Sequence, residues 1–209
     1  MNKFIKYGLL LAIVALLGYK SVYFEKLSTR KNTSAAAFDA TAFSKKIWAE
    51  KMPAKLDSAV ALTALMSEIT KNPADAFNKY TNALAIGNYR YALVKFDAVV
   101  AEIKEDELLL NIQTGDSILQ AKLATEFIYG NAVRDASRLV QVKDYPNTTD
   151  LNSISEALNK IVRTEVLPVF KPSIKKGNNV SVVAAVELNK EHIHWKELEL
   201  QPLRITIKP

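Results

Sequence analysis

The chain has 209 residues, 49% of them hydrophobic and 24% charged, which is enough apolar material for one buried core. It contains no cysteine, so disulfides, thiol catalysis and acylation of a cysteine are excluded. The formal net charge is +6, but residues 1–38 hold six of the 28 basic and one of the 22 acidic residues, leaving 22 basic against 21 acidic residues in the remainder. Because nucleic-acid binders draw affinity from a basic surface, this nearly neutral body does not favour a nucleic-acid partner.

The N-terminal segment, residues 1–27, has the pattern of a secretory signal. Lys3 and Lys6 precede an uncharged, mostly apolar run from Tyr7 to Tyr19. The small residues that signal peptidase prefers before its cleavage point are poorly matched after this run. We therefore expect residues 4–24 to stay in place as an uncleaved signal anchor in the inner membrane. Conventional cleavage and a buried core helix are the alternatives.

The apolar run is shorter than the ~20 residues of a bilayer-spanning helix. Lys20 can extend its charge toward the membrane surface, and residues 22–24 then lengthen the apolar stretch. Residues 28–38 are small and polar, which indicates a linker. The folded part is thus expected on the periplasmic, extracytoplasmic face of the inner membrane.

Residues 39–87 have the period of packed helices and form an expected helical cap. Asp39 is the expected N-cap of the first helix, and Pro53 is expected to end or kink it. Two more helices are expected, one with its apolar side from Val60 to Ile69 and one from Pro73 to Gly87.

Residues 88–209 change to strand patterns. The expected strands cover residues 89–103, 108–113, 117–127, 179–188 and 198–207. An irregular stretch and then a helix over residues 150–167 lie between the third and fourth strands; Ser153 and Glu156 have the spacing of a capping box, and the helix is expected to stop before Pro168. Three strands, a helix and two strands are the order of an OB-fold, so we predict an α+β chain whose partly closed five-stranded β-barrel follows the helical cap. An open α+β sheet with helices on one face is the alternative.

Three motifs carry a resemblance to a known family. They are "FIYGNAVRDA" (Phe127–Ala136), "VKDYPNTTDLNSISEALNKIV" (Val142–Val162) and "KIW" (Lys46–Trp48). On these motifs the chain resembles a bacterial family of predicted periplasmic lipoproteins known only as domain of unknown function 2291. The resemblance covers essentially the whole folded part.

The resemblance implies an outer-face location and an accessory role in solute uptake, since such proteins often appear to be encoded beside sugar-importing ABC transporters. It provides no activity to transfer. The chain departs from the family where the anchoring cysteine is replaced by Tyr19, so a lipid anchor does not follow. Thr125 and Glu126 replace a Gly-Pro pair that precedes the family's R-D-A segment.

Five residues are candidate ligand contacts. Arg134 and Asp135 offer a guanidinium fork and a carboxylate for a polar ligand; their alternative role is to pin a loop by a buried ion pair. Asp144, Tyr145 and Asn147 are suited to hydrogen bonding and stacking with a carbohydrate; their alternative role is a turn that leads into a helix.

Catalytic and metal-binding patterns are missing from the sequence. There is no G-x-S-x-G, H-E-x-x-H, phosphate-binding glycine loop or dinucleotide motif. His192 and His194 would point to one side of a strand, but zinc needs a third protein ligand. We therefore expect no catalytic residues, no metal and no cofactor.

The sequence predicts a non-enzymatic accessory or binding module for solute uptake. Its expected partners are the inner membrane through residues 4–24, an ABC transporter or a solute-binding protein, and a small polar ligand such as a sugar. One alternative is an oligonucleotide-binding module that would use Tyr89, Tyr91 and Phe96 on its first strands. Another is an envelope enzyme of unknown reaction.

Overall fold

The computed structural model describes residues 3–21, 38–145 and 147–209. The chain divides into two units, residues 1–38, which hold helix α1 (Lys3–Ser21), and residues 39–209. Among the helices of the described ranges, none combines the length and the hydropathy that a membrane span requires. Two predictions fall outside the described part: the linker, apart from Phe38, and the role of residues 22–24 in lengthening the anchor.

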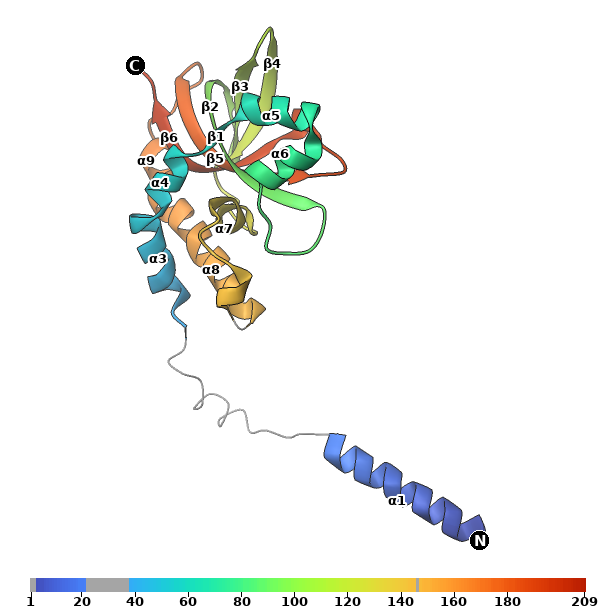
Figure 1. The fold of residues 1–209 in the computed structure, drawn as a ribbon. Helices are drawn as coiled ribbons and strands as arrows, with labels where there is room; N and C mark the ends of the chain where they lie inside the picture. The colour runs from blue at the N-terminus through green and yellow to red at the C-terminus, as the bar shows by residue number, and fades with distance from the viewer. Residues whose placement is uncertain (1–2, 22–37, 146) are drawn as a thin grey trace. The chain divides into compact units, whose positions relative to one another are not determined.

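Residues 39–209 are built around a closed β-barrel (Figure 1). Its strands are β2 (Tyr89–Ile103), β3 (Glu107–Thr114), β4 (Ser117–Ala124), β5 (Asn179–Asn189) and β6 (Glu199–Ile207). They pair in the order β2-β3-β4-β6-β5, and β5 pairs back onto β2. The predicted OB-like barrel, with its helix between the third and fourth strands, is therefore confirmed, and the open-sheet alternative is wrong.

The two long strands β2 and β5 supply most of the closure. They are antiparallel and stay in register from Tyr89↔Asn189 to Val99↔Asn179. A β-bulge between Val100 and Glu102 then lets the end of β2 turn toward β3. The last closure, between β4 and β6, is parallel and contains only the pairs Lys122↔Glu199 and Leu123↔Leu200. The barrel is thus tightly paired on one side and barely paired on the other.

The helical cap has four helices and a short strand. They are α3 (Ala40–Glu50), α4 (Met52–Asp57), β1 (Val60–Ala61), α5 (Leu62–Lys71) and α6 (Pro73–Tyr80). Asp39 is the N-cap of α3, as predicted, and its Oδ1 accepts a hydrogen bond from the Ala42 amide at 2.9 Å. The first helix ends at Glu50, just before Pro53, as predicted, and Pro53 lies in the first turn of α4, where no donor is needed from proline. Two details were wrong: Val60 pairs with Val94 of β2, and the third helix ends at Tyr80, short of the expected Gly87.

The connection between β4 and β5 is more helical than expected. It contains α7 (Ala132–Ser137), the 3₁₀ turn η1 (Val142–Asp144), α8 (Thr148–Ile161), the π-helical segment η2 (Val162–Val166) and α9 (Leu167–Phe170). Figure 1 shows α8 beside α3 at one end of the barrel, where the two helices pack together. The expected irregular stretch therefore holds the short helix α7, which packs against β2, β5 and α8.

Both predicted ends of the long helix were wrong. Asn147 caps α8 through a 2.9 Å bond from the Asp150 amide to its Oδ1, so Ser153 and Glu156 lie inside the helix and form no capping box. The π-helical segment η2 lies between α8 and α9. Pro168 therefore occupies the first turn of a new helix, α9, where its missing N–H group is not needed. The helical path consequently continues to Phe170.

Leu158→Ala on α8 is expected to lower the free energy of unfolding by about 2–5 kcal/mol, because Leu158 is completely buried and its truncation leaves a cavity. Val169→Ala is the control, since Val169 on α9 is 75% exposed, and it should change stability by no more than about 0.5 kcal/mol. Urea denaturation of the full chain, followed by circular dichroism, measures both values. Equal effects would contradict the packing of α8 onto the core.

Candidate functional site

Arg134 and Asp135 of α7 form a buried ion pair. Their side chains are only 3% and 1% exposed, and Arg134 Nε lies 2.6 Å from Asp135 Oδ1. Arg134 Nη1 also donates to the Leu151 carbonyl at 3.0 Å, and Asp135 Oδ2 accepts from the Leu84 amide at 3.1 Å. The pair therefore ties α7 to the start of α8 and to the segment after α6. With their charges paired and out of solvent, the two residues act as a structural pin.

Asp144, Tyr145 and Asn147 follow α7 in the chain, and each has a different environment. Asp144 is exposed at the end of η1, and Asn147 is occupied as the cap of α8. Tyr145 is half-buried, with its ring edge-on to Phe43 at a centroid distance of 6.0 Å. Burial, followed by the charges of Asp144 and Asp150, raises the pKa of Tyr145. The five predicted ligand residues thus do not converge, and none of them lines a cavity described below.

The histidines lie in the connection between β5 and β6. His192 and His194 are both exposed and border a depression of about 370 Å³ together with Tyr89 and Glu187. Within the described residues, no three His, Asp or Glu side chains are grouped so that they could hold a metal ion.

The three aromatic residues considered for a nucleic-acid surface do not share one exposed face. Tyr89 is exposed, Tyr91 is half-buried and Phe96 is buried in the barrel. Burial, followed by a hydrogen bond with Glu187, raises the pKa of Tyr91. These side chains consequently do not form the stacking platform that single-stranded nucleic acid uses.

A groove that the sequence analysis missed lies beside the short β4–β6 pairing. It encloses about 220 Å³, and we call it the aromatic groove. Its lining residues are Ala124, Phe127, Tyr129, Gly130, Asn131, Ala132, Ala185, Glu187, Glu199, Leu200 and Gln201. The groove exists because β4 ends at Ala124 while β6 continues, so the chain after β4 leaves the barrel wall.

The segment from Thr125 to Gly130 forms one wall of the aromatic groove. Side chains from other elements bind its carbonyls: Lys171 to Thr125 at 3.1 Å, Arg163 to Ile128, Gln201 to Tyr129 at 2.7 Å and Asn159 to Gly130 at 2.9 Å. Gly130 has φ +77°, a left-handed conformation that glycine adopts without strain. This wall is therefore fixed before any ligand arrives.

The fixed wall presents two aromatic rings to solvent. Phe127 is 63% exposed and Tyr129 is 68% exposed, whereas Ile128 between them is buried and anchors the segment. Two large rings are thus available at the edge of the groove.

The opposite side of the aromatic groove is polar. Glu187 of β5 and Glu199 of β6 are exposed carboxylates that line it. Gln201 donates through Nε2 to the Tyr129 carbonyl, while its buried Oε1 has no hydrogen-bond partner within the described residues. Carboxylate and amide oxygens accept hydrogen bonds from hydroxyl groups. The groove accordingly combines ring faces with acceptors suited to a small polyhydroxylated ligand.

Most of this site gave no signal in the sequence. Phe127 and Tyr129 fall inside the "FIYGNAVRDA" motif, but residues 117–127 were predicted to form a strand, so Phe127 was not considered as a ligand contact. The spacing of two aromatic residues around a buried isoleucine was the available signal. Glu187, Glu199 and Gln201 are ordinary outward positions of strands until the barrel brings them together.

Comparisons with known proteins agree with this fold. A family profile described as "Predicted periplasmic lipoprotein", domain of unknown function 2291, matches residues 12–206, which confirms the resemblance seen in the sequence. The crystal structure of an OB-fold protein from Thermotoga maritima is similar, with a TM-score of 0.71 and 23% identity, over 82% of this chain and 99% of that one. At this identity, the likeness shows the fold alone. The search of curated proteins found no match.

Asp135→Ala is expected to lower the free energy of unfolding by about 3–5 kcal/mol, because it leaves the buried Arg134 charge without its partner. Asp144→Ala removes an exposed carboxylate and should change stability by about 0.5 kcal/mol or less. The double variant Arg134→Met/Asp135→Leu should recover much of the loss, since no charge stays buried. Chemical denaturation measures all three, and an Asp135→Ala variant as stable as Asp144→Ala would refute the pin.

Proposed function

The chain belongs to the family of predicted periplasmic lipoproteins, and from this membership and the aromatic groove we propose that it is a non-enzymatic binding or accessory module for solute uptake. Its family places the protein outside the cytoplasm. In the proposed role the folded unit, residues 39–209, meets a sugar or a sugar-loaded partner at the outer face of the inner membrane.

The sugar proposal rests on one observation: two exposed aromatic rings lie on the segment from Thr125 to Gly130, whose carbonyls are held by hydrogen bonds from other elements. Sugars offer apolar C–H faces that stack on aromatic rings and hydroxyl groups that donate to carboxylates. Phe127 and Tyr129 provide the rings, while Glu187, Glu199 and Gln201 provide acceptors on the other side. The groove volume of about 220 Å³ is below the ~300 Å³ at which pockets for drug-sized molecules begin, so a single sugar unit is the fitting size.

A link to an ABC transporter is the second part of the proposal. It draws support from the extracytoplasmic family and from the genomic association implied by the resemblance. Residues 39–209 hold 22 basic and 21 acidic residues, a balance that suits recognition by shape and specific groups more than attraction to a polyanion. A transporter subunit or a solute-binding protein is the proposed partner.

We also propose that residues 4–24 keep the protein at the membrane. The chain has no cysteine for lipid attachment, and Tyr19 stands where that cysteine would be. Residues Tyr7 to Tyr19 carry no charge, and aromatic side chains favour the membrane interface. Helix α1 covers most of this segment, and residues 22–24 would have to complete it.

Phe127→Ala and Tyr129→Ala are each expected to weaken sugar binding at least about tenfold, because each removes a stacking face. Titration of the full chain with D-glucose, D-galactose and D-xylose, monitored by saturation-transfer NMR, measures binding. Tyr129→Phe keeps the ring and should retain most of the affinity.

Ile118→Ala is the control for this series, since Ile118 is 65% exposed on β4 outside the groove, and it should leave the affinity unchanged. An absence of signal with all three sugars would reject the sugar as ligand. Equal weakening by Ile118→Ala and Tyr129→Ala would reject the groove as its site.

A tagged full-length chain is expected in the membrane fraction, exposed to protease added to spheroplasts, and associated with a transporter subunit. Deletion of residues 4–24 should leave the protein in the cytosol, since the signal is lost. Fractionation, protease accessibility and mass spectrometry of the affinity-purified sample provide the readouts. A full-length protein that is freely dissolved in the cytosol would contradict the proposed location.

A further inference from the structure

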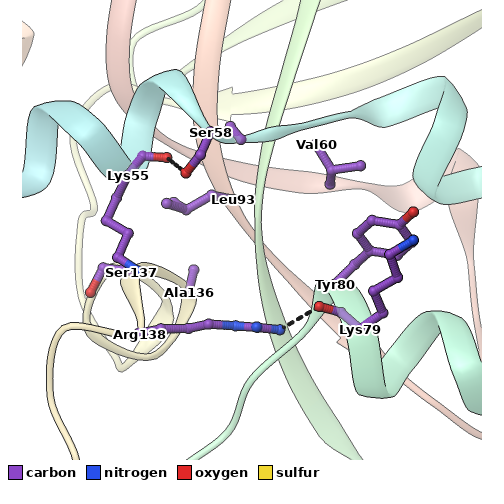
Figure 2. A pocket seen from close by; sticks show the side chains of 10 residues that line it. Lys55, Ser58, Val60, Lys79, Tyr80, Leu93, Ala136, Ser137 and Arg138 are labelled. Atoms are coloured by element: carbon purple, nitrogen blue, oxygen red, sulfur yellow. Dashed lines mark hydrogen bonds between the residues drawn. The ribbon is translucent and has the colours of Figure 1, made fainter.

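A second pocket, separate from the aromatic groove, gathers basic side chains from three elements (Figure 2). It encloses about 170 Å³ between α4, α6, β2 and the end of α7, and we call it the basic pocket. Lys55 comes from α4, Lys79 from α6 and Arg138 from the residue that follows α7. In Figure 2 the Lys55 side chain extends toward Ser137, and the Arg138 side chain extends toward Lys79.

Arg138 is held in position by the fold. It has φ +55°, a left-handed conformation that costs a residue with a Cβ roughly 1 kcal/mol or more. Its Nη2 donates to the Lys79 carbonyl at 2.9 Å and to the Thr81 carbonyl at 2.7 Å. Within the described residues, Nε and Nη1 have no hydrogen-bond partner. The guanidinium is thus fixed at one edge while its other donors remain available.

The two lysines of the pocket form no ion pair within the described part of the chain. Lys79 Nζ lies 4.9 Å from the centre of the Tyr80 ring, and a hydrogen bond with Tyr80, followed by the charges of Tyr80 and Glu68, raises the pKa of Lys79. No lining residue is acidic. Two nearby carboxylates are already engaged, since Asp57 binds Arg204 at 2.8 Å and Glu68 lies 3.8 Å from Lys71. Three basic residues therefore line a small space that no carboxylate lines.

We infer that the basic pocket binds a phosphate group, carried either by a small soluble phosphate ester or by a lipid headgroup. A phosphate monoester brings up to two negative charges and three acceptor oxygens, which suit the open donors of Arg138 and a lysine ammonium at the edge of the pocket. The small volume admits a phosphate but not a folded polyanion. This site does not depend on sugar binding in the aromatic groove.

The test compares two double variants that remove the same charge. Lys55→Gln/Lys79→Gln alters the basic pocket, and Lys175→Gln/Lys176→Gln alters two exposed lysines elsewhere. One arm titrates the full chain in detergent with glycerol 3-phosphate by calorimetry. The other arm measures binding of the full chain to phosphatidylglycerol vesicles, with phosphatidylcholine vesicles as the neutral reference.

The pocket variant is expected to lose at least about tenfold in affinity in one arm, while the control variant loses less than about twofold. A loss in the first arm identifies a soluble phosphate ester, and a loss in the vesicle arm alone identifies a lipid headgroup. Lys55→Arg/Lys79→Arg should retain binding, which separates a lost contact from a lost fold. If the pocket and control variants behave alike in both arms, the phosphate site is refuted.

Discussion

The parallel pairing between β4 and β6 stops after Lys122–Glu199 and Leu123–Leu200, and the backbone beyond it must find other partners. A longer pairing would have continued the barrel wall and left no groove. Because β4 ends at Ala124, the next six residues cross an opening in the barrel instead of extending a strand. The candidate site is a consequence of this short closure, since one of its walls is the segment that leaves β4 and the other is formed by β5 and β6.

Polar side chains replace the missing strand partner. Asn159 of α8, Arg163 of the π-helical segment, Lys171 and Gln201 each bind a carbonyl between Thr125 and Gly130. The π-helical turn and α9 extend the helix alongside this segment, so three of these side chains come from one continuous helical path. The buried ion pair of α7 fixes the start of α8 on the barrel. The ion pair of α7 thus positions α8, and the helical path from α8 to Lys171 in turn holds the segment that carries the two exposed rings.

The barrel was predictable because its strands have strong local signals. The residues from Val94 to Val100 alternate between buried and exposed positions, and the order of strands and helix matches one known topology. Two element boundaries were not predicted. Asn147 and Ser153 both offered a local cap, and α8 starts at the earlier one, through the bond from the Asp150 amide to Asn147. Val60 pairs with the distant Val94 of β2 although its neighbours have a helical period.

The candidate site could not be read from the sequence for a related reason. Arg134 and Asp135 are chemically suited to a ligand, and only their burial against α8 and the Leu84 amide shows that they bind each other. Glu187 and Gln201 belong to different strands and meet only through the barrel. Arg138 and Lys55 are 83 positions apart, so no local pattern could reveal the basic pocket.

The hydrogen bonds to its carbonyls require the segment from Phe127 to Gly130 to be rigid before any ligand binds. Nitrogen-15 relaxation of the ligand-free full chain measures this directly through the backbone order parameters of Ile128, Tyr129 and Gly130. The hydrogen bonds to their carbonyls predict values near 0.85, equal to those of the neighbouring strands. Values below about 0.6 would contradict the account, because the rings would then belong to a flexible loop.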